Sequence, residues 1–376
     1  LVPMIDIDAI GAGGGSIAYI DPGGAFRVGP RSAGADPGPA CYRRGGTVAT
    51  VTDANLFLGR LSPAGLLDGQ MPMDLDCAAA ALAPLAERLG FSAQRTACGI
   101  VDIAVANMVR AIRRVSVERG HDPRDCTLLA FGGAGPLHAR AVAASLALRE
   151  VMITRSPGIL CAQGLLVSDL TDEFVFSKLL ALDEPGLRAL REGLESLSAQ
   201  AHSWFEQEAV SPAARLLELS LDARYSGQNF ELPVVLWQGP AAELPAAVSS
   251  AALLTASALR AGFERAHEQA YGYANSEDPV EAVNLRLRTR AVQSAAEPGL
   301  PPASTGEARA VAHRAVWFDS ESSVQTPIYV RDALAPGHCL QGPCVVEQLD
   351  TTTVVFPGDT LRVDELGNLI LNIAIE

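Results

Sequence analysis

The chain has 376 residues, of which 48% are hydrophobic and 19% are charged, so it can bury a sizeable core and disorder is not expected. This length exceeds one hydrophobic core and predicts two or three domains. The formal net charge is -14, and an acidic chain without a Lys/Arg cluster argues against nucleic-acid binding. Small anionic ligands stay compatible with this charge, because backbone N–H groups can bind phosphates.

The cysteines and the apolar segments indicate the compartment. Seven cysteines are scattered along the chain without a Cys-x-x-Cys pair, which is typical of small core residues in a reducing environment. Charged residues or glycines interrupt every apolar stretch before the roughly 20 residues that a membrane helix needs. No signal-peptide pattern is present. We therefore expect a cytoplasmic protein without a membrane span, and we expect residues 1–6 to be the interior of a longer protein.

The first predicted elements form a β-meander around a glycine-rich segment. Residues 5–10 alternate apolar and polar side chains and predict a half-buried strand, followed by strands at 17–20 and 25–28. Asp6 and Asp8 share one face of the first strand, so they could hold Mg²⁺ or activate water, or they could simply face solvent. The first glycine loop, residues 11–16, offers consecutive N–H groups to an anion. Its predicted ligand contacts are Gly11, Gly13, Gly14, Gly15 and Ser16.

Residues 29–46 are rich in glycine and proline and predict an irregular loop. An ordered loop of this length is usually functional. Asp36 and Cys41 flank its Pro-Gly-Pro turn, and Asp53 follows the loop, so all three are candidate catalytic residues. A nucleophilic Cys41 would need a partner base that the sequence does not locate.

Two amphipathic helices are predicted next, at residues 75–89 and 95–119, with Gly120 as the C-cap of the second. The arginines of the second helix lie away from its apolar stripe, where a solvated face is a simpler explanation than an anion site. His121 lies in the following turn, where a polar cap explains it as well as catalysis does.

A βαβ unit follows, with strands at 127–131 and 151–154 and a helix at 137–146. The second glycine loop, residues 132–136, connects the buried first strand to the helix. Its glycines would let the backbone approach a nucleotide, Gly135 would permit a positive φ, and Pro136 suits the first helical turn. The alternative is that these glycines only allow tight helix–strand packing. The predicted ligand contacts are Gly132, Gly133, Ala134, Gly135, Pro136 and His138, the histidine being neutral at a helix N-terminus.

The rest of the chain predicts a mixed α+β region and then a strand-rich C-terminal region. Helices are expected at 187–210 and 257–270, strands at 217–224, 230–236 and 280–289, and a linker at 297–305. The predicted domains are residues 1–180, 181–296 and 297–376.

Several of these segments together resemble the hydantoinase A/5-oxoprolinase family. The similar text includes Ile10-Gly-Ala-Gly-Gly-Gly-Ser-Ile17, Ala35-Asp-Pro-Gly-Pro-Ala-Cys-Tyr42, Ala130-Phe-Gly-Gly-Ala-Gly-Pro-Leu-His138 and Gly342-Pro-Cys-Val-Val-Glu347. The resemblance spans essentially the whole chain, and strings of this length and order rarely arise by chance.

The resemblance implies an α/β chain that forms the second half of an actin/Hsp70/sugar-kinase-like ATPase fold, with the second glycine loop contacting adenosine. It implies ATP and Mg²⁺ as cofactors, a hydantoinase B-like subunit as partner, and hydrolysis of a cyclic amide such as a hydantoin or 5-oxoproline. The alternatives are the ATPase subunit of an acetone/acetophenone-type carboxylase and a non-catalytic structural module.

Two departures from the family pattern limit the transfer of roles. The upstream phosphate loops of the family are missing, so a further N-terminal ATPase half is expected as a partner and the chain alone should bind ATP weakly. The family usually has Asp-Ile-His-Thr where this chain has Asp6-Ile-Asp-Ala9, which changes the predicted ligand type at Asp8.

Overall fold

The computed structural model describes residues 7–67, 69–249, 253–293, 299 and 306–374. The chain divides into two compact units, one made of Leu1–Gln163 with Pro298–Glu376, the other of Gly164–Glu297. This division differs from the three predicted regions, because the C-terminal segment belongs with the N-terminal one and the first boundary lies earlier than residue 180. The predicted linker at 297–305 falls almost entirely outside the described residues.

The first unit begins with an antiparallel hairpin, as predicted, formed by β1 (Ser16–Ile20) and β2 (Phe26–Ser32). Because β2 continues to Ser32, the irregular loop begins later than expected. The strand predicted at 5–10 is wrong over residues 7–10, which are irregular, with Ile7 77% exposed. A half-buried strand needs a neighbour to pair its backbone, and none of the described strands supplies one there. Asp6 lies outside the described residues.

Three helices follow: α1 (Val51–Phe57), α2 (Leu75–Leu89) and α3 (Ala93–Val115). The bounds of α2 agree with the prediction. The third helix ends at Val115 rather than 119, and Gly120, with φ 82°, closes the 3₁₀ turn Val117–Arg119 that comes after it. Helix α1 was not predicted, although Thr50 and Asp53 form a capping box at its start.

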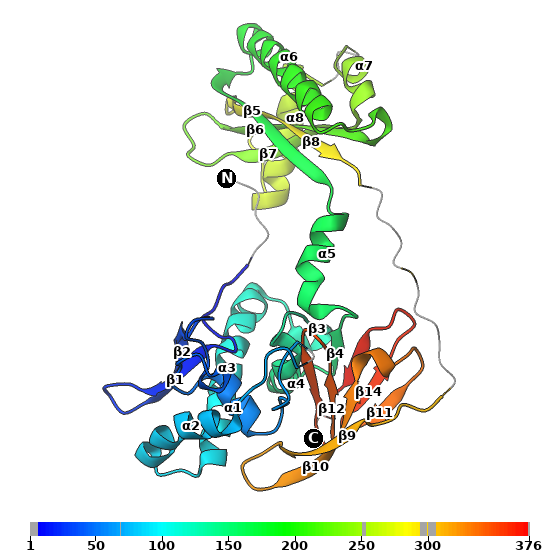
Figure 1. Ribbon diagram of the computed structural model, residues 1–376. Helices are drawn as coiled ribbons and strands as arrows, with labels where there is room; N and C mark the ends of the chain where they lie inside the picture. Colours follow the sequence, from blue (N-terminus) through cyan, green and yellow to red (C-terminus); the bar gives the residue numbers. More distant parts are fainter. Residues whose placement is uncertain (1–6, 68, 250–252, 294–298, 300–305, 375–376) are drawn as a thin grey trace. The chain divides into compact units, whose positions relative to one another are not determined.

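The first unit contains a five-stranded sheet in the order β11-β14-β15-β4-β3, of which β3, β4, β11 and β14 are labelled in Figure 1. Strands β3 and β4 are parallel and joined by α4, which confirms the predicted βαβ unit. The sheet is completed by β15, which pairs antiparallel with β4. The edge strand β3 is less buried than expected, with Leu129 45% exposed. The bounds are β3 (Leu128–Ala130), α4 (Gly135–Ser145), β4 (Glu150–Ile153), β11 (Cys339–Gln341), β14 (Thr360–Val363) and β15 (Leu369–Asn372).

A second sheet of the first unit has the order β13-β12-β10-β9. Arg140 of α4 holds the turn between β13 and β14, since its Nε lies 2.8 Å from an oxygen of the fully buried Asp359 carboxylate. One hydrophobic core joins α1–α4, β3 and β4 to these C-terminal strands. The bounds are β9 (Ala312–Trp317), β10 (Ser323–Val330), β12 (Cys344–Glu347) and β13 (Thr352–Val355).

The second unit is an antiparallel sheet in the order β5-β8-β6-β7, with helices α6, α7 and α8. Strand β5 was not predicted, because most of its side chains are exposed and it lacks a regular apolar period. Helix α5 (Leu160–Val167) crosses the boundary between the units. The bounds are β5 (Leu170–Ala181), α6 (Glu184–Gln207), β6 (Arg215–Tyr225), β7 (Leu232–Pro240), α7 (Leu244–Ser249), α8 (Ala256–Tyr271) and β8 (Val280–Ala291).

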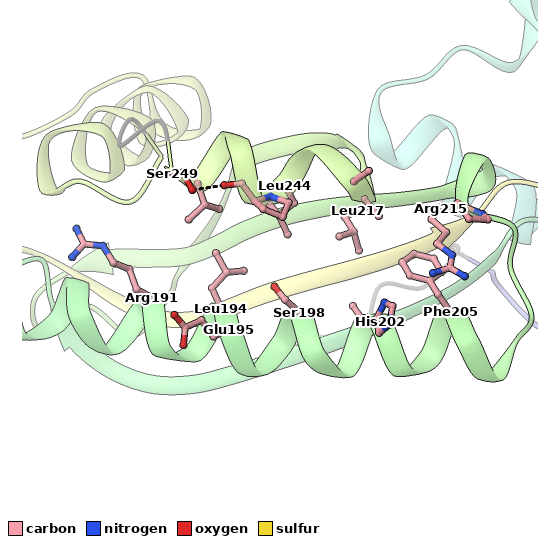
Figure 2. A pocket seen from close by; sticks show the side chains of 16 residues that line it. Arg191, Leu194, Glu195, Ser198, His202, Phe205, Arg215, Leu217, Leu244 and Ser249 are labelled. Atoms are coloured by element: carbon pink, nitrogen blue, oxygen red, sulfur yellow. Dashed lines mark hydrogen bonds between the residues drawn. The ribbon is translucent and has the colours of Figure 1, made fainter.

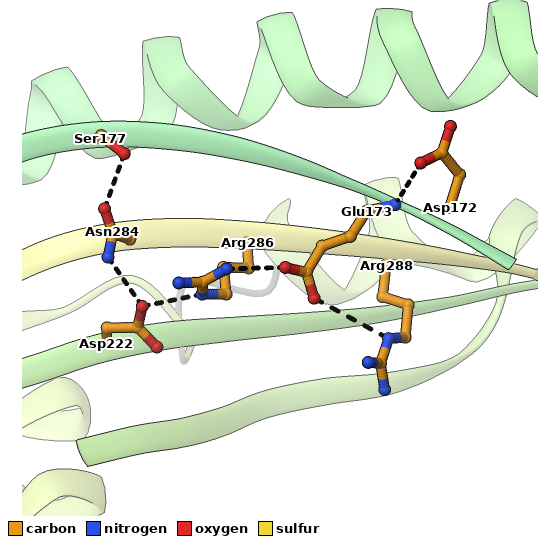
Figure 3. Close-up of polar contacts among 7 residues, drawn as sticks. All are labelled: Asp172, Glu173, Ser177, Asp222, Asn284, Arg286 and Arg288. Carbon is orange, nitrogen blue, oxygen red and sulfur yellow. Dashed lines mark hydrogen bonds and ion pairs between the residues drawn. The ribbon is translucent and has the colours of Figure 1, made fainter. Parts of the chain in front are cut away.

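The sheet of the second unit has one apolar and one polar face. Alternate residues such as Leu221 and Leu285 pack with the helices in a separate core. On the other face, Asp222 accepts a hydrogen bond from Arg286 (2.7 Å), which also donates to Glu173 (2.6 Å), as Figure 3 shows. Arg288 is a second cation beside Glu173, with Nε and Oε2 3.8 Å apart, so the two carboxylates face two guanidinium groups and these ion pairs explain the polar face structurally. Within the described residues, no helix has the length and apolar character needed to cross a bilayer.

Candidate functional site

The two glycine loops, far apart in the sequence, meet at one pocket of about 350 Å³ in the first unit. Its walls come from both loops, from α1, from the start of α4 and from the turn between β12 and β13, and the segment after α1 adds Leu61, Leu66, Leu67 and Met71. The lining residues that matter most for chemistry are Gly14, Asn55, Gly133, His138, Asp350 and Thr351. The pocket is thus built from the two predicted glycine loops together with segments for which no ligand contact was predicted.

The second glycine loop has room for a ligand. Gly132 adopts φ 80° and donates its N–H to the carbonyl oxygen of Pro157 at 2.8 Å, so the positive φ occurs here and not at Gly135 as expected. A Cβ on Gly133 would come no closer than 3.5 Å to its nearest neighbour, and one on Gly135 no closer than 3.9 Å. Packing therefore does not require glycine at these two positions, which weighs against the packing explanation.

The start of α4 borders this pocket without a side-chain cap. Its N-cap, Ala134, makes no side-chain hydrogen bond, and Pro136 occupies the first turn. Helix N-termini with free N–H groups carry a partial positive charge that favours anionic or polar ligands. Thr351 supports the loop from the other side, since its hydroxyl donates to the carbonyl oxygen of Gly133 at 3.0 Å.

The first glycine loop is more tightly packed. A Cβ on Gly11 would lie 2.6 Å from Cβ of Pro30, so packing alone requires this glycine. The hydroxyl of Ser16 accepts the N–H of Gly13 at 2.9 Å and closes the loop on itself. The loop is fastened to α1, because Thr52 donates its N–H to the carbonyl oxygen of Gly14 at 2.8 Å. Gly14 of this loop forms part of the pocket wall. Most of the other glycines in the loop allow it to adopt its compact conformation.

Three polar side chains that line the pocket bury atoms without a hydrogen-bond partner in the described part of the chain. These atoms are Oδ1 of Asn55, both ring nitrogens of His138 and Oδ1 of Asp350. Asn55 is fully buried and His138 is 2% exposed. Burial, and to a lesser extent the nearby Arg60 cation, lowers the pKa of His138 to about 4. Unpaired buried polar atoms are costly, so their convergence on one pocket indicates a polar ligand.

Asp53 makes structural contacts at the start of α1. Its fully buried carboxylate accepts hydrogen bonds from the N–H groups of Thr50 (2.9 Å) and Cys41 (2.8 Å) and from the Thr50 hydroxyl (2.7 Å). It also lies within 3.3 Å of the Ala40 N–H. These contacts cap α1 and anchor the glycine- and proline-rich loop, and the catalytic role of Asp53 stays a prediction.

The burial of Cys41 argues against its predicted catalytic role. The side chain is completely buried. Burial raises the pKa of its thiol far above the ordinary value, and the neighbouring Asp53 carboxylate raises it further. Because the thiolate is the nucleophilic form, this environment disfavours a nucleophilic Cys41.

The remaining acidic and histidine candidates do not line the pocket. Asp8 forms an ion pair with Arg114, with Nη1 and Oδ2 2.8 Å apart. Asp36 and His121 are exposed on separate loops. Among the residues that the structure describes, no group of three or more His, Cys, Asp or Glu side chains could hold a metal ion. The predicted corner of Asp6 and Asp8 therefore gains no support from the described residues.

A larger cavity of about 700 Å³ lies in the second unit between α6 and α7 (Figure 2). Its polar side chains include Glu195 and His202, which are exposed on α6. Arg215 at its end already donates to the carbonyl oxygen of Val210 at 2.7 Å. None of the predicted site residues lines this cavity, and it offers no buried polar atom without a partner among the described residues.

Comparison with known proteins places this architecture in a family. The profile described as hydantoinase/oxoprolinase matches residues 1–174, and that of the hydantoinase/oxoprolinase C-terminal domain matches residues 185–372. The chain belongs to the hydantoinase/oxoprolinase family. The resemblance noted from the glycine loops is thereby confirmed.

Named relatives of this hydantoinase/oxoprolinase chain act on different substrates. It is 36% identical to the caprolactamase subunit alpha of Pseudomonas jessenii over 96% of this chain and 52% of the relative. It is 31% identical to the acetophenone carboxylase gamma subunit of Aromatoleum aromaticum, over 98% of this chain and 51% of the relative. The chain thus spans about half the length of these relatives.

Solved structures agree with the family assignment. The crystal structure of the ATP-dependent caprolactamase from Pseudomonas jessenii matches with TM-score 0.71 and 35% identity, over 99% of this chain and 53% of that one. The nucleotide-free acetone carboxylase matches with TM-score 0.83 over 98% of this chain and 52% of that one. At 22% identity this second likeness shows the fold alone.

Proposed function

We propose that the chain is part of an ATP-dependent enzyme that hydrolyses a cyclic amide. The observation that carries the proposal is the pocket between the two glycine loops, with its unpaired Asn55, His138 and Asp350 atoms. Family membership, and the similarity to a caprolactamase subunit, give this pocket its chemical context. ATP would supply a phosphoryl group that activates the amide carbonyl, so that water opens the ring C–N bond and ADP and inorganic phosphate are released.

The chain's own residues would bind and orient the reactants. The second glycine loop and the uncapped start of α4 would hold the adenosine part of the nucleotide, as the second half of an actin/Hsp70/sugar-kinase-like ATPase fold. The space beside Gly133 and Gly135 supports this role. His138 would donate or accept a hydrogen bond in its neutral form, because its lowered pKa keeps it uncharged at neutral pH.

A divalent cation such as Mg²⁺ would enter with the nucleotide. Asp8 would have to leave Arg114 to become a ligand for it, and the described residues offer no preformed cluster. The phosphates and the part of the enzyme outside this chain would then supply the other ligands. A hydantoinase B-like subunit and a further ATPase half are the partners that we propose for the complete enzyme.

The test is ATP turnover by the full-length protein assembled with its hydantoinase B-like partner. We expect phosphate release that depends on a hydantoin, 5-oxoproline or lactam. A carboxylase is the second candidate, supported by the similarity to the acetophenone carboxylase subunit; it would hydrolyse ATP only with a ketone and bicarbonate. If the assembled enzyme hydrolyses ATP neither with a cyclic amide nor with a ketone and bicarbonate, both enzyme proposals are refuted. The structural module would then be the remaining explanation.

A further inference from the structure

A second cavity of the first unit, about 700 Å³ in volume, adjoins the pocket between the glycine loops at the turn between β12 and β13. Its walls come from this turn, from residues 155–159, from the 3₁₀ turn Arg331–Ala333 and from the turn between β14 and β15. Leu349 and Asp350 are the lining residues that the two spaces share. None of the site residues predicted from the sequence lines this second cavity, so it is a separate candidate for ligand binding.

Arg331 is a buried cation of this cavity that lacks a countercharge. The side chain belongs to a residue that is only 5% exposed, and its Nη2 donates to the carbonyl oxygen of Gly367. Its Nε is buried without an acceptor, and no carboxylate in the described part of the chain forms an ion pair with it. A guanidinium stays protonated in proteins, and a buried charge without a partner is costly. An anion in the cavity would supply the missing countercharge.

A second cation lines the same cavity. Arg155 is exposed there, and among the described residues it too has no ion pair. Burial, and to a lesser extent the positive charge of Arg155, lowers the pKa of Arg331. Two neighbouring cations repel each other, so an anion bound beside both would offset this repulsion as well as the cost of burying Arg331.

The acidic lining residues indicate how much charge the anion can carry. Asp332, Glu347 and Asp350 also line the cavity. A doubly charged phosphate would meet more repulsion from these carboxylates than a singly charged carboxylate ligand would. A carboxylate also matches the planar guanidinium group, which can donate to both of its oxygens.

The walls add an apolar surface to these charges. Ile159 and Leu349 are 54% and 51% exposed, and Leu334 is buried behind the cavity surface. Covering exposed aliphatic side chains with a hydrocarbon chain is favourable. The lining therefore matches a ligand that has a carboxylate at one end and an aliphatic body.

We propose that this cavity binds a small aliphatic carboxylate, whose oxygens pair with the guanidinium groups of Arg331 and Arg155. The alkyl chain of this ligand lies against Ile159, Leu334 and Leu349. The site is distinct from the nucleotide pocket, and the inference does not depend on the proposed function.

Hexanoate and hexanamide are matched probes, because they have the same alkyl chain and differ in charge. In ligand-observed NMR titrations of the chain at pH 7, we expect hexanoate to bind about tenfold or more tightly than hexanamide. Equal affinity for the two probes would overturn the proposal. Inorganic phosphate should compete poorly with hexanoate; if it binds this site more tightly than hexanoate does, the carboxylate assignment is wrong.

Two arginine substitutions locate the binding. Arg331→Met removes the buried cation and should weaken hexanoate binding about tenfold or more. The control Arg362→Met removes the same charge from a half-exposed position on β14 that does not line the cavity, and it should leave the affinity unchanged. An equal loss in both variants would show that hexanoate responds only to the net charge of the chain, which would overturn the proposal.

A third variant keeps the test decisive if Arg331→Met folds poorly. Arg155 is exposed, so Arg155→Gln should preserve the fold and weaken hexanoate binding about threefold, as expected for an exposed ion pair. Hexanoate should also raise the thermal unfolding midpoint of the wild type more than that of Arg155→Gln. Unchanged affinity and an unchanged thermal shift in Arg155→Gln would overturn the assignment of the carboxylate to these two arginines.

Discussion

Asn55 and His138 show how single residues can be diagnostic when their hydrogen bonds are counted. Each is almost fully buried, and each leaves a polar atom unpaired beside the pocket. Gly133 adds a complementary signal, because no packing contact explains the absence of a side chain there. Asp53 and Cys41 were also candidate site residues in the sequence. Both are buried, and the carboxylate of Asp53 accepts a hydrogen bond from the N–H of Cys41.

Gly133→Val should weaken ATP binding of the assembled enzyme by about tenfold or more, because the added side chain would occupy the ligand space. The nearest atom to a Cβ at this position is 3.5 Å away, so folding should be largely preserved. Calorimetric titration with ATP measures the effect, and Gly164→Val, at an open position in α5, is the matched control. Unchanged ATP affinity would exclude the adenosine role of the loop.

His138 should make the stability of the first unit depend on pH. Burial lowers its pKa in the folded chain to about 4, whereas the pKa of a histidine in an unfolded chain is about 6.5. Above pH 6.5 the side chain is mostly neutral in both states, so its burial carries no penalty from protonation. As the pH falls from 6.5 towards 4 the unfolded chain takes up a proton that the folded one does not, and stability is lost. Between pH 7 and pH 5 we expect a loss of about 2 kcal/mol from this residue. Urea unfolding of the wild type and His138→Leu should show a smaller pH dependence in the variant; an equal dependence would contradict the assignment.

At the scale of elements, α1 organises the site although it was not predicted. It contributes Thr52 and Asn55 to the pocket, and its capping residue Asp53 fastens the irregular loop. The Thr50-x-x-Asp53 spacing was a usable signal for this helix, since a capping box has this form. The βαβ unit was predictable because its strand, glycine loop and helix are adjacent in the sequence.

Asp53→Ala should destabilise the first unit by about 3 kcal/mol, because it removes a helix cap and leaves several buried donors unpaired. Asp76→Ala provides the control, since Asp76 is an exposed residue in the first turn of α2 and should change stability by about 0.5 kcal/mol or less. Urea denaturation monitored by circular dichroism measures both. If Asp53→Ala abolished turnover without a loss of stability, the result would support the catalytic role predicted for Asp53 from the sequence.

At the scale of the molecule, the first unit is assembled from two segments separated by the whole of the second. Strand β15 pairs with β4, placing Leu371 opposite Val151. Thr351 reaches the Gly133 carbonyl oxygen across 218 positions of sequence. The pocket therefore depends on the C-terminal strands as well as on the glycine loops.

A fragment of residues 164–297 should unfold cooperatively on its own, because it contains its entire sheet and its own core. Residues 1–163 should not form a stable fold without residues 298–376, since they would expose the backbone edge of β4 that pairs with β15. Thermal unfolding and hydrogen exchange of the fragments check this. Protection of β4 in residues 1–163 alone would contradict the two-segment unit.

The sequence by itself determined the local features: the hairpin, helix α2, the βαβ unit, the second glycine loop and the family resemblance. Each depends on periodicity, turn residues or short motifs within one continuous segment. Only the tertiary structure decided that residues 298–376 belong with the first unit, and that Asn55 and Asp350 meet the glycine loops. The physical reason is that strand pairing and burial join segments far apart in the chain, and no local pattern records the partner. The pocket is therefore a property of the fold, although its glycine loops were visible in the sequence.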